Sequence, residues 1–328
     1  MLYLEFLDGQ GLGNQLWNYV TLRSISKKLG FGYEIINPEK FKGKTFLEIS
    51  YSENFVDNNL KTFKKKNEIN NIYNEKLFYD GELKTFASDF DENILKIKVN
   101  TLIRGLFQSE KYLLNNDINE FIKLKKEFNE CSKFQNQCLL NIRGGEYKRF
   151  KNLILPKTYW INAIKNMKRI KNDLNFSIVT DDYNYASKLL PEIDILSGNI
   201  HDDFSRIFYA KYIIVSNSSF PYFPINLGEK PKKIIAPAHW SRFANTKDKW
   251  VSPANYYKNW SYQNELGIIL SNQEIKKSIN KTRKIYNSYF VLTTKESVLR
   301  KTILFYIPSK LRKLIKKILS KIFPLEIG

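Results

Sequence analysis

Short apolar runs that end in glycine or in polar residues recur along the chain. The first run, residues 2–6, predicts a strand, and the glycine-rich stretch 8–17 leads into a helix that is expected to end near Leu29, with Gly30 as its stop. A glycine loop between a strand and a helix lets backbone N–H groups approach a phosphorylated or polar ligand closely. The opening of the chain therefore predicts a nucleotide-type α/β unit.

The glycine loop does not complete the dinucleotide-binding fingerprint. That fingerprint needs a glycine three residues after Gly11, where this chain has Asn14, although Glu34 stands near the place of the ribose-binding acid. A tight turn without any ligand explains the loop as well as a binding site does. The rest of the chain has to separate the two interpretations.

From residue 138 onward the pattern becomes regular. Apolar runs at 138–142, 176–180, 212–215 and 233–236 predict strands, and helices are predicted over 158–174 and from Asp202. Strands that alternate with helices indicate a parallel sheet covered on both faces. Ligands bind beyond the carboxyl ends of such strands. The polar residues expected there are Arg143, Asp181, Asp182, Ser216, Asn217, Ser218 and Ser219.

Each of these strand-end groups suits part of a nucleotide ligand. The planar guanidinium of Arg143 can grip two oxygens of a diphosphate. Hydroxyl and N–H groups of the serine turn can bind phosphate oxygens, and Asp181 or Asp182 can accept hydrogen bonds from a base or a ribose. The common structural alternatives are a surface ion pair, a helix cap and a turn. Their placement at successive strand ends favours a nucleotide or sugar-nucleotide site.

Length and composition predict two domains of similar size. The 328 residues exceed a usual single core, and we expect domains at 1–132 (acceptor side) and 133–270 (donor nucleotide), followed by a basic helical tail at 271–328. No apolar stretch approaches the length of a membrane span. Cys131 and Cys138 are expected to be free thiols, and the first residues lack a secretory pattern, so a cytoplasmic location is expected.

Basic residues are concentrated in the tail. Residues 271–328 hold fourteen Lys or Arg against three Glu, which is +11 of the formal net charge of +20. Within it, 310–323 places apolar residues on one helical face and Lys or Arg mostly on the other. This pattern predicts reversible binding to an anionic membrane surface, at the inner face of the cytoplasmic membrane. Docking on the protein's own core is the alternative, and a charge confined to the tail disfavours nucleic-acid binding.

Six short segments between residues 8 and 262 follow one another along the chain. They are Gly11-Leu12-Gly13-Asn14-Gln15, Gln108-Ser109-Glu110-Lys111-Tyr112, Arg143-Gly144-Gly145-Glu146-Tyr147, Thr180-Asp181-Asp182, Asn217-Ser218-Ser219-Phe220, and Ala236-Pro237 with Trp240. In this order they resemble motifs of glycosyltransferase family 11, the bacterial and animal α-1,2-fucosyltransferases. Their joint order is more specific than any one of them.

The resemblance implies a GT-B-like α/β fold, with two Rossmann-like domains and a cleft between them. The implied reaction is an inverting, metal-independent transfer of fucose from GDP-fucose to a hydroxyl of a surface-glycan precursor, in α-1,2 linkage, without a cofactor. By this resemblance Arg143 holds the β-phosphate, segment 180–182 faces the guanosine, and Ser218 or Ser219 touches the diphosphate. The loop at 11–15 closes over the donor from the other domain.

Inversion requires a base for the acceptor hydroxyl and positive charge for the leaving diphosphate. Glu146 is the candidate base, and an ion pair with Lys148 or Arg149 is its structural alternative. The two histidines, His201 and His239, lie outside the shared motifs.

The chain departs from the family pattern at two places. Where His-x-Arg-Arg-Gly-Asp is usual, it has Asn141 and Gly144 in place of the His and the second Arg, and Tyr222 and Phe223 replace paired tryptophans. These changes predict a reshaped sugar pocket and leave transfer of a different nucleotide sugar open. A non-catalytic homologue, or a basic membrane- or nucleic-acid-binding protein, is the alternative of another class.

One short motif points to a metal instead. Asp89-Phe90-Asp91 matches the Asp-x-Asp pair of metal-dependent glycosyltransferases, but its surroundings are polar and no further ligand accompanies it. We therefore expect no metal site.

Overall fold

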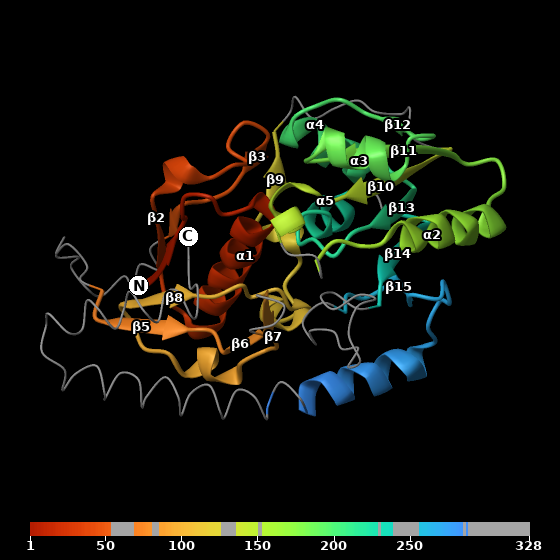
Figure 1. Cartoon of the computed structure of the whole chain (residues 1–328). Coiled ribbons are helices and arrows are strands. Elements are labelled where there is room, and N and C mark those ends of the chain that lie inside the picture. The colour runs from red at the N-terminus through yellow and green to blue at the C-terminus, as the bar shows by residue number, and fades with distance from the viewer. Residues whose placement is uncertain are drawn as a thin grey trace, which may run out of the picture.

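The computed structural model describes residues 1–53, 69–80, 85–125, 136–149, 153–228, 231–238, 256–284 and 287. They form two largely parallel sheets with helices packed on them (Figure 1), which confirms the predicted pair of Rossmann-like α/β units. Cys131, His239, Trp240 and the 310–323 segment lie outside the described residues. The domain boundaries at 132/133 and 270/271 stay predictions.

The first sheet has five strands in the order β4-β2-β1-β8-β5. Strands β1, β2, β8 and β5 run parallel, and β4 pairs antiparallel with β2. The carboxyl ends of the parallel strands therefore share one edge. The strand bounds are Leu2–Glu5 (β1), Tyr33–Ile36 (β2), Ser52–Glu53 (β4), Asn71–Asn74 (β5) and Thr101–Arg104 (β8).

Helix α1 (Leu12–Leu29) follows the glycine loop and has the predicted end. Gly30 adopts the left-handed conformation with φ 68°, and its N–H donates to the Ser26 carbonyl. Lys27 and Lys28 in the last turn favour the negative end of the helix dipole. The part of the molecule built around the first sheet is called the first half below, and the part built around the second sheet is called the second half. Most of α1 is buried, because the helix lies between the first sheet and the second half (Figure 1).

The second sheet has six parallel strands in the order β12-β11-β10-β13-β14-β15. Its central strands are buried on both faces, which explains their nearly continuous apolar sequences. The strand bounds are Gln137–Ile142 (β10), Asn175–Thr180 (β11), Asp194–Ile195 (β12), Tyr212–Val215 (β13), Lys233–Pro237 (β14) and Ser261–Gln263 (β15).

Different helices cover the two faces of the second sheet. Helices α2 (Lys157–Ile170) and α3 (Tyr183–Leu189) pack on the face that carries Leu140, Ile178 and Ile214. The other face packs on α4 (Ile200–Tyr209) and α5 (Tyr222–Leu227), within one hydrophobic cluster that also contains the core of the first sheet. The two halves of the molecule thus share a continuous apolar core.

Helix α4 begins two residues earlier than its sequence predicts. Asn199 is its N-cap, with a side chain that accepts from the N–H groups of His201 and Asp202. The Asp202 carboxylate accepts from the Asn199 N–H in return. Asp202, predicted to start the helix, is therefore the N3 residue of a capping box whose N-cap is Asn199.

Smaller elements complete the described structure. Strands β3 (Leu47–Glu48) and β9 (Lys123–Leu124) pair with each other, as do β6 (Leu77–Asp80) and β7 (Thr85–Ser88). A helix over 272–284 returns to the first half, where Arg283 forms an ion pair with Asp89 at 2.6 Å. The short 3₁₀ helices are η1 (Pro38–Lys40), η2 (Glu92–Lys96), η3 (Glu110–Leu113), η4 (Ile118–Glu120) and η7 (Gly145–Arg149).

Candidate functional site

A pocket of about 250 Å³ opens at the carboxyl edge of the second sheet. Three predicted site residues from three different strand ends, Arg143, Asp181 and Ser218, line it together. The parallel topology explains this convergence, because β10, β11 and β13 are adjacent and end at the same edge. The other lining residues are Asn141, Ile142, Thr180, Gly198, Asn199, Ile200, Asp203 and Phe220.

Arg143 follows β10 directly and is held in the pocket by carboxylates. Its Nη1 lies 2.8 Å from Asp181 Oδ2 and its Nη2 lies 3.2 Å from Glu146 Oε1. The guanidinium also sits over the Tyr147 ring, 5.5 Å from its centroid. With 29% of its side chain exposed, it is oriented by these partners and still open to a ligand.

Glu146 is mostly exposed, and its ion-pair partner is Arg143 rather than Lys148 or Arg149. The residue lies on η7, which immediately follows the end of β10. Its carboxylate pairs with Arg143, but Glu146 itself does not line the pocket. Its assignment as the base stays a prediction.

The structure supplies a physical reason for the glycine at position 144, where the family has a second arginine. A Cβ at Gly144 would lie 2.7 Å from the Cβ of Asp182 and 2.8 Å from a ring carbon of Tyr185. Asp182 is the N-cap of α3, accepts from the Tyr185 N–H at 3.0 Å, and forms an ion pair with Lys148. Although burial opposes ionisation, Lys148 and these backbone donors lower the pKa of Asp182. Asp182 thus caps a helix and does not line the pocket, unlike Asp181.

The serine turn after β13 divides its residues between the pocket and the fold. Ser218 lines the pocket, and its Oγ accepts from the Phe220 N–H at 3.3 Å. Asn217 is buried and donates from its amide to the Leu153 carbonyl at 2.9 Å. Ser219 donates from its hydroxyl to Asn14 Oδ1 at 2.7 Å. The turn therefore joins the pocket to the first half of the molecule.

The glycine loop meets that turn directly. A Cβ at Gly13 would lie 2.6 Å from the Ser219 carbonyl carbon and 2.7 Å from the Phe220 nitrogen. Asn14, which replaces the last glycine of the dinucleotide fingerprint, accepts from Ser219 and also from Gln108 Nε2, at 2.7 Å each. Gly13 is thus required for close packing between the two halves of the molecule, and Asn14 bridges them.

Two further residues of the loop are placed differently. Gln15 is fully buried, donates to the Lys40 carbonyl at 2.9 Å and accepts from the Lys42 N–H at 2.9 Å. Its amide is engaged inside the first half, away from the pocket. Gly11 is the N-cap of α1, and a Cβ there would meet no atom within 4 Å.

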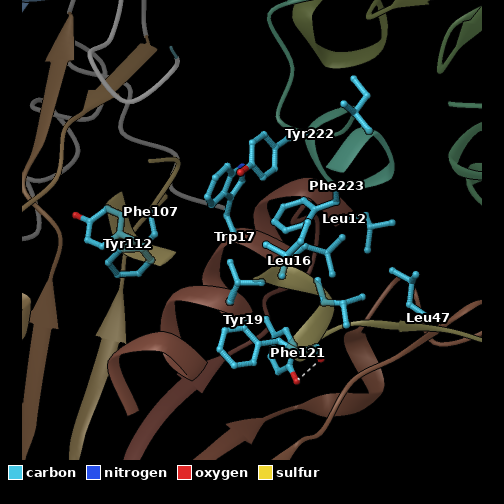
Figure 2. Packing of buried hydrophobic residues seen from close by; sticks show 14 of the residues in the cluster. Leu12, Leu16, Trp17, Tyr19, Leu47, Phe107, Tyr112, Phe121, Tyr222 and Phe223 are labelled. Carbon is cyan, nitrogen blue, oxygen red and sulfur yellow. Dashed lines mark hydrogen bonds between the residues drawn. The ribbon is translucent and has the colours of Figure 1, made fainter. Parts of the chain in front are cut away.

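Tyr222 and Phe223 do not line the pocket, which corrects the prediction that they reshape the sugar site. Both are buried on α5 and pack on Trp17 of α1, with ring centroids 4.3 and 5.3 Å away (Figure 2). The Tyr222 hydroxyl donates to Glu110 Oε1 at 3.1 Å. These aromatic rings belong to the core between the two halves.

Sequence reasoning missed the part of the pocket that α4 supplies. The amino-terminal end of α4 brings Asn199, Ile200 and Asp203 to the pocket. Burial raises the pKa of Asp203 to about 6, against the effect of Arg206, whose Nη1 lies 3.2 Å from it. The Asn199-to-Asp202 capping box was the available signal for the helix start, which would have placed Asp203 in the first turn.

The Asp-x-Asp motif takes part in the fold through several partners. Asp89 forms an ion pair with Arg283. Asp91 accepts hydrogen bonds from Tyr73 and Asn93 and forms an ion pair with Lys76 at 3.7 Å. Across the residues that the structure describes, no group of three or more His, Cys, Asp or Glu side chains is arranged to hold a metal ion. Within that same part of the chain, no helix combines the length and apolarity needed to cross a membrane.

Comparison with known proteins finds a relative whose sequence is similar to part of this chain. An α-1,2-colitosyltransferase from Escherichia coli is 27% identical over 175 residues, which is 45% of this chain. The match spans 60% of that relative's length. No family model matches the chain.

Solved structures similar to the chain include several fucosyltransferases. POFUT1 in complex with GDP-fucose aligns with a TM-score of 0.43 and 9% identity, covering 72% of this chain and 96% of that protein. The fucosyltransferase NodZ from Bradyrhizobium aligns with a TM-score of 0.39 and 14% identity, covering 69% and 93%. E. coli heptosyltransferase WaaC with ADP aligns with a TM-score of 0.42 and 10% identity, and the alignment covers 86% of this chain and 99% of that protein.

The name of this sequence relative denotes an α-1,2 glycosyltransferase, and the six motifs resemble those of a family of α-1,2 glycosyltransferases. This match supports the resemblance of the chain to glycosyltransferase family 11.

Proposed function

We propose that the protein is an inverting glycosyltransferase that uses a nucleotide diphosphate sugar, with the second sheet binding the donor. The observation that carries the proposal is the joint placement of Arg143, Asp181 and Ser218 around one pocket at the carboxyl edge of a parallel sheet. Transfer from GDP-fucose to a hydroxyl of a surface-glycan precursor, in α-1,2 linkage, is the specific reaction we propose.

The residues around the pocket suit the chemistry of such a transfer. A bidentate guanidinium at Arg143 would neutralise charge that develops on the leaving diphosphate. Ser218 offers a hydroxyl to a phosphate oxygen. We assign Glu146, which pairs with Arg143, as the base that accepts the proton of the acceptor hydroxyl. Charge on the leaving group is thereby met by protein groups, so we propose a reaction that needs no metal ion.

The carboxylate of Asp203 supports guanine as the base. Guanine presents a ring N–H and an amino group side by side, and an ionised carboxylate can accept from both. The ring N–H of uracil is flanked by carbonyl oxygens that would face the same carboxylate. A pKa near 6 leaves Asp203 ionised at neutral pH, despite its burial.

The transferred sugar has one further candidate. The sequence relative is an α-1,2-colitosyltransferase. Asn141, which lines the pocket, and Gly144 both depart from the fucosyltransferase pattern. Transfer of another deoxy sugar or nucleotide sugar on the same scaffold is therefore the second proposal.

A thermal-shift screen tests the donor. Purified full-length protein is heated with GDP, UDP, CDP and their sugars, because a ligand that binds only the native state raises the apparent melting temperature. We expect GDP and GDP-fucose to raise it and UDP and CDP to leave it nearly unchanged. Stabilisation by UDP or CDP alone would replace the guanosine proposal, and no stabilisation by any nucleotide would contradict the transferase proposal.

A turnover assay separates the roles of metal and base. We expect activity to survive a chelator, whereas its abolition would return Asp89 and Asp91 to consideration as metal ligands. Glu146→Gln is expected to depress turnover and leave donor affinity nearly intact, because only the transition state needs the base. Equal losses in both would indicate a purely structural carboxylate.

We also propose that the basic 310–323 segment binds anionic lipid and holds the enzyme at the cytoplasmic membrane face. Its sequence alternates apolar and basic positions at helical spacing, and each Lys or Arg near an anionic bilayer contributes about 1 kcal/mol. Flotation with vesicles of mixed phosphatidylcholine and phosphatidylserine tests this. Full-length protein should float and a truncation at Lys295 should not, and a truncated protein that still floats would contradict the assignment.

A further inference from the structure

A buried carboxylate lies in the first half of the molecule, outside the donor pocket. Glu75 follows β5 and is only 5% exposed. Its Oε2 accepts from the N–H groups of Leu106 and Phe107, at 2.7 and 2.8 Å. Burial raises the pKa of Glu75 to about 7, and Asp91 adds to this rise, while the two N–H donors and the Tyr112 hydroxyl oppose it. Burial of a carboxyl group is unfavourable unless it is hydrogen-bonded, so the two bonds that Glu75 Oε2 accepts require an explanation.

The turn held by Glu75 is strained. Phe107 is fully buried and has a φ of 50°, the left-handed region that bulky side chains rarely occupy. Its ring packs edge to face on Tyr112, with centroids 5.2 Å apart (Figure 2). Such a conformation is energetically unfavourable and persists only where its surroundings enforce it. The paired bonds from successive N–H groups to one carboxylate oxygen provide that enforcement.

The strained turn presents Gln108 to the junction between the two halves. Gln108 Nε2 donates to Asn14 Oδ1 at 2.7 Å, and the same oxygen accepts from the Ser219 hydroxyl at 2.7 Å. Ser219 lies between Ser218 and Phe220, which both line the donor pocket. A continuous series of hydrogen bonds thus runs from the first sheet to the rim of the pocket.

We propose that Glu75 is a positioning residue for the donor pocket: it holds the 106–108 turn so that Gln108, through Asn14, fixes the Ser219 turn. The side chain is too deeply buried to touch a substrate, so it acts only through these neighbours. The assignment of the pocket to a nucleotide donor rests on the proposed function, whereas the link from Glu75 to the Ser219 turn does not.

Two measurements on the full chain test this proposal. The first is hydrogen exchange of peptides that cover 216–221, without ligand, and the second is the dissociation constant for GDP. Glu75→Ala leaves two buried N–H groups without an acceptor, and we expect exchange at 216–221 to quicken about tenfold and GDP to bind about tenfold more weakly. Glu75→Gln keeps a carbonyl acceptor and should restore both within about twofold.

Two further variants keep the test decisive. Thr101→Ala removes a partly buried hydrogen bond at the opposite end of β8, from Thr101 Oγ1 to the Lys98 carbonyl at 2.7 Å, and should leave both measurements unchanged. Gln108→Ala removes the link without touching the buried carboxylate and should reproduce the effect of Glu75→Ala, even if that variant fails to fold.

The outcomes separate the two proposals. Unchanged exchange at 216–221 in Gln108→Ala, or an equal effect from Thr101→Ala, would overturn the role of Glu75. Quickened exchange in Glu75→Ala and Gln108→Ala, together with a wild-type protein that does not bind GDP, would retain the role of Glu75 and contradict the guanosine donor instead.

Discussion

The glycine loop before α1 and the serine turn after β13 look alike in sequence, yet the structure employs them differently. Both combine small and polar residues after an apolar strand. In the glycine loop, Gly13 packs on backbone and Gln15 bonds inside the first half. In the serine turn, Ser218 lines an open pocket beside Arg143. The comparison teaches that polar residues at a strand end can line a pocket only where segments distant in the chain leave their side chains accessible.

The largest expected effect comes from adding a methyl group to the tightly packed glycine loop. Gly13→Ala would drive a Cβ into the backbone of Ser219 and Phe220, at 2.6 and 2.7 Å, where no flexible side chain can yield. We expect the free energy of unfolding to fall by roughly 3 kcal/mol or more, measured by chemical denaturation.

Gly11→Ala is the matched control, because a Cβ there meets nothing within 4 Å. We expect its stability to change by less than about 0.5 kcal/mol. Similar losses in both variants would contradict the packing role of Gly13, and loss of GDP binding in the stable Gly11→Ala protein would restore a ligand role to the loop.

The second largest effect is expected at the open pocket beside the serine turn. Arg143→Ala should lower turnover by roughly 10²–10³, the usual result of removing one preorganised donor to developing charge. Stability should change little, since the Arg143 ion pairs are partly exposed. Arg143→Lys keeps the charge, loses the bidentate geometry and should fall in between. Near-normal turnover in Arg143→Ala, measured with saturating donor, would rule out its diphosphate role.

The smallest effect concerns base recognition within the pocket. Asp203→Asn should reduce the preference for GDP over UDP by about tenfold, because an amide oxygen accepts but its NH₂ meets a guanine donor. In the wild type this preference should decline as pH falls through about 6, where Asp203 takes up a proton, and stay constant above it. Comparing two diphosphates by calorimetry cancels the titration of the phosphates. A preference independent of pH in the wild type would exclude Asp203.

Sequence reasoning located the second sheet and its polar edge for a simple reason. The pattern of apolar residues and the polar residues that end a strand are local properties of the sequence. The apolar run at 212–215 therefore marked both the strand and the position of Ser218. The same reasoning did not foresee the core position of Tyr222 and Phe223 or the hydrogen bonds of the Gln15 amide, since the partners of these residues lie far away in the chain. Asp203 was missed because its access to the pocket depends on how α4 packs on the sheet.

The apolar cluster that includes both sheets has a consequence for engineering. Trp17 of the first half is enclosed by Tyr222, Phe223 and Tyr257 of the second, with centroid distances of 4.3, 5.3 and 5.8 Å. A chimera that exchanges only the donor-binding half between relatives would expose this indole or bury it against unmatched rings. Successful domain exchange in this protein therefore requires that α1 and α5 be transplanted as a pair.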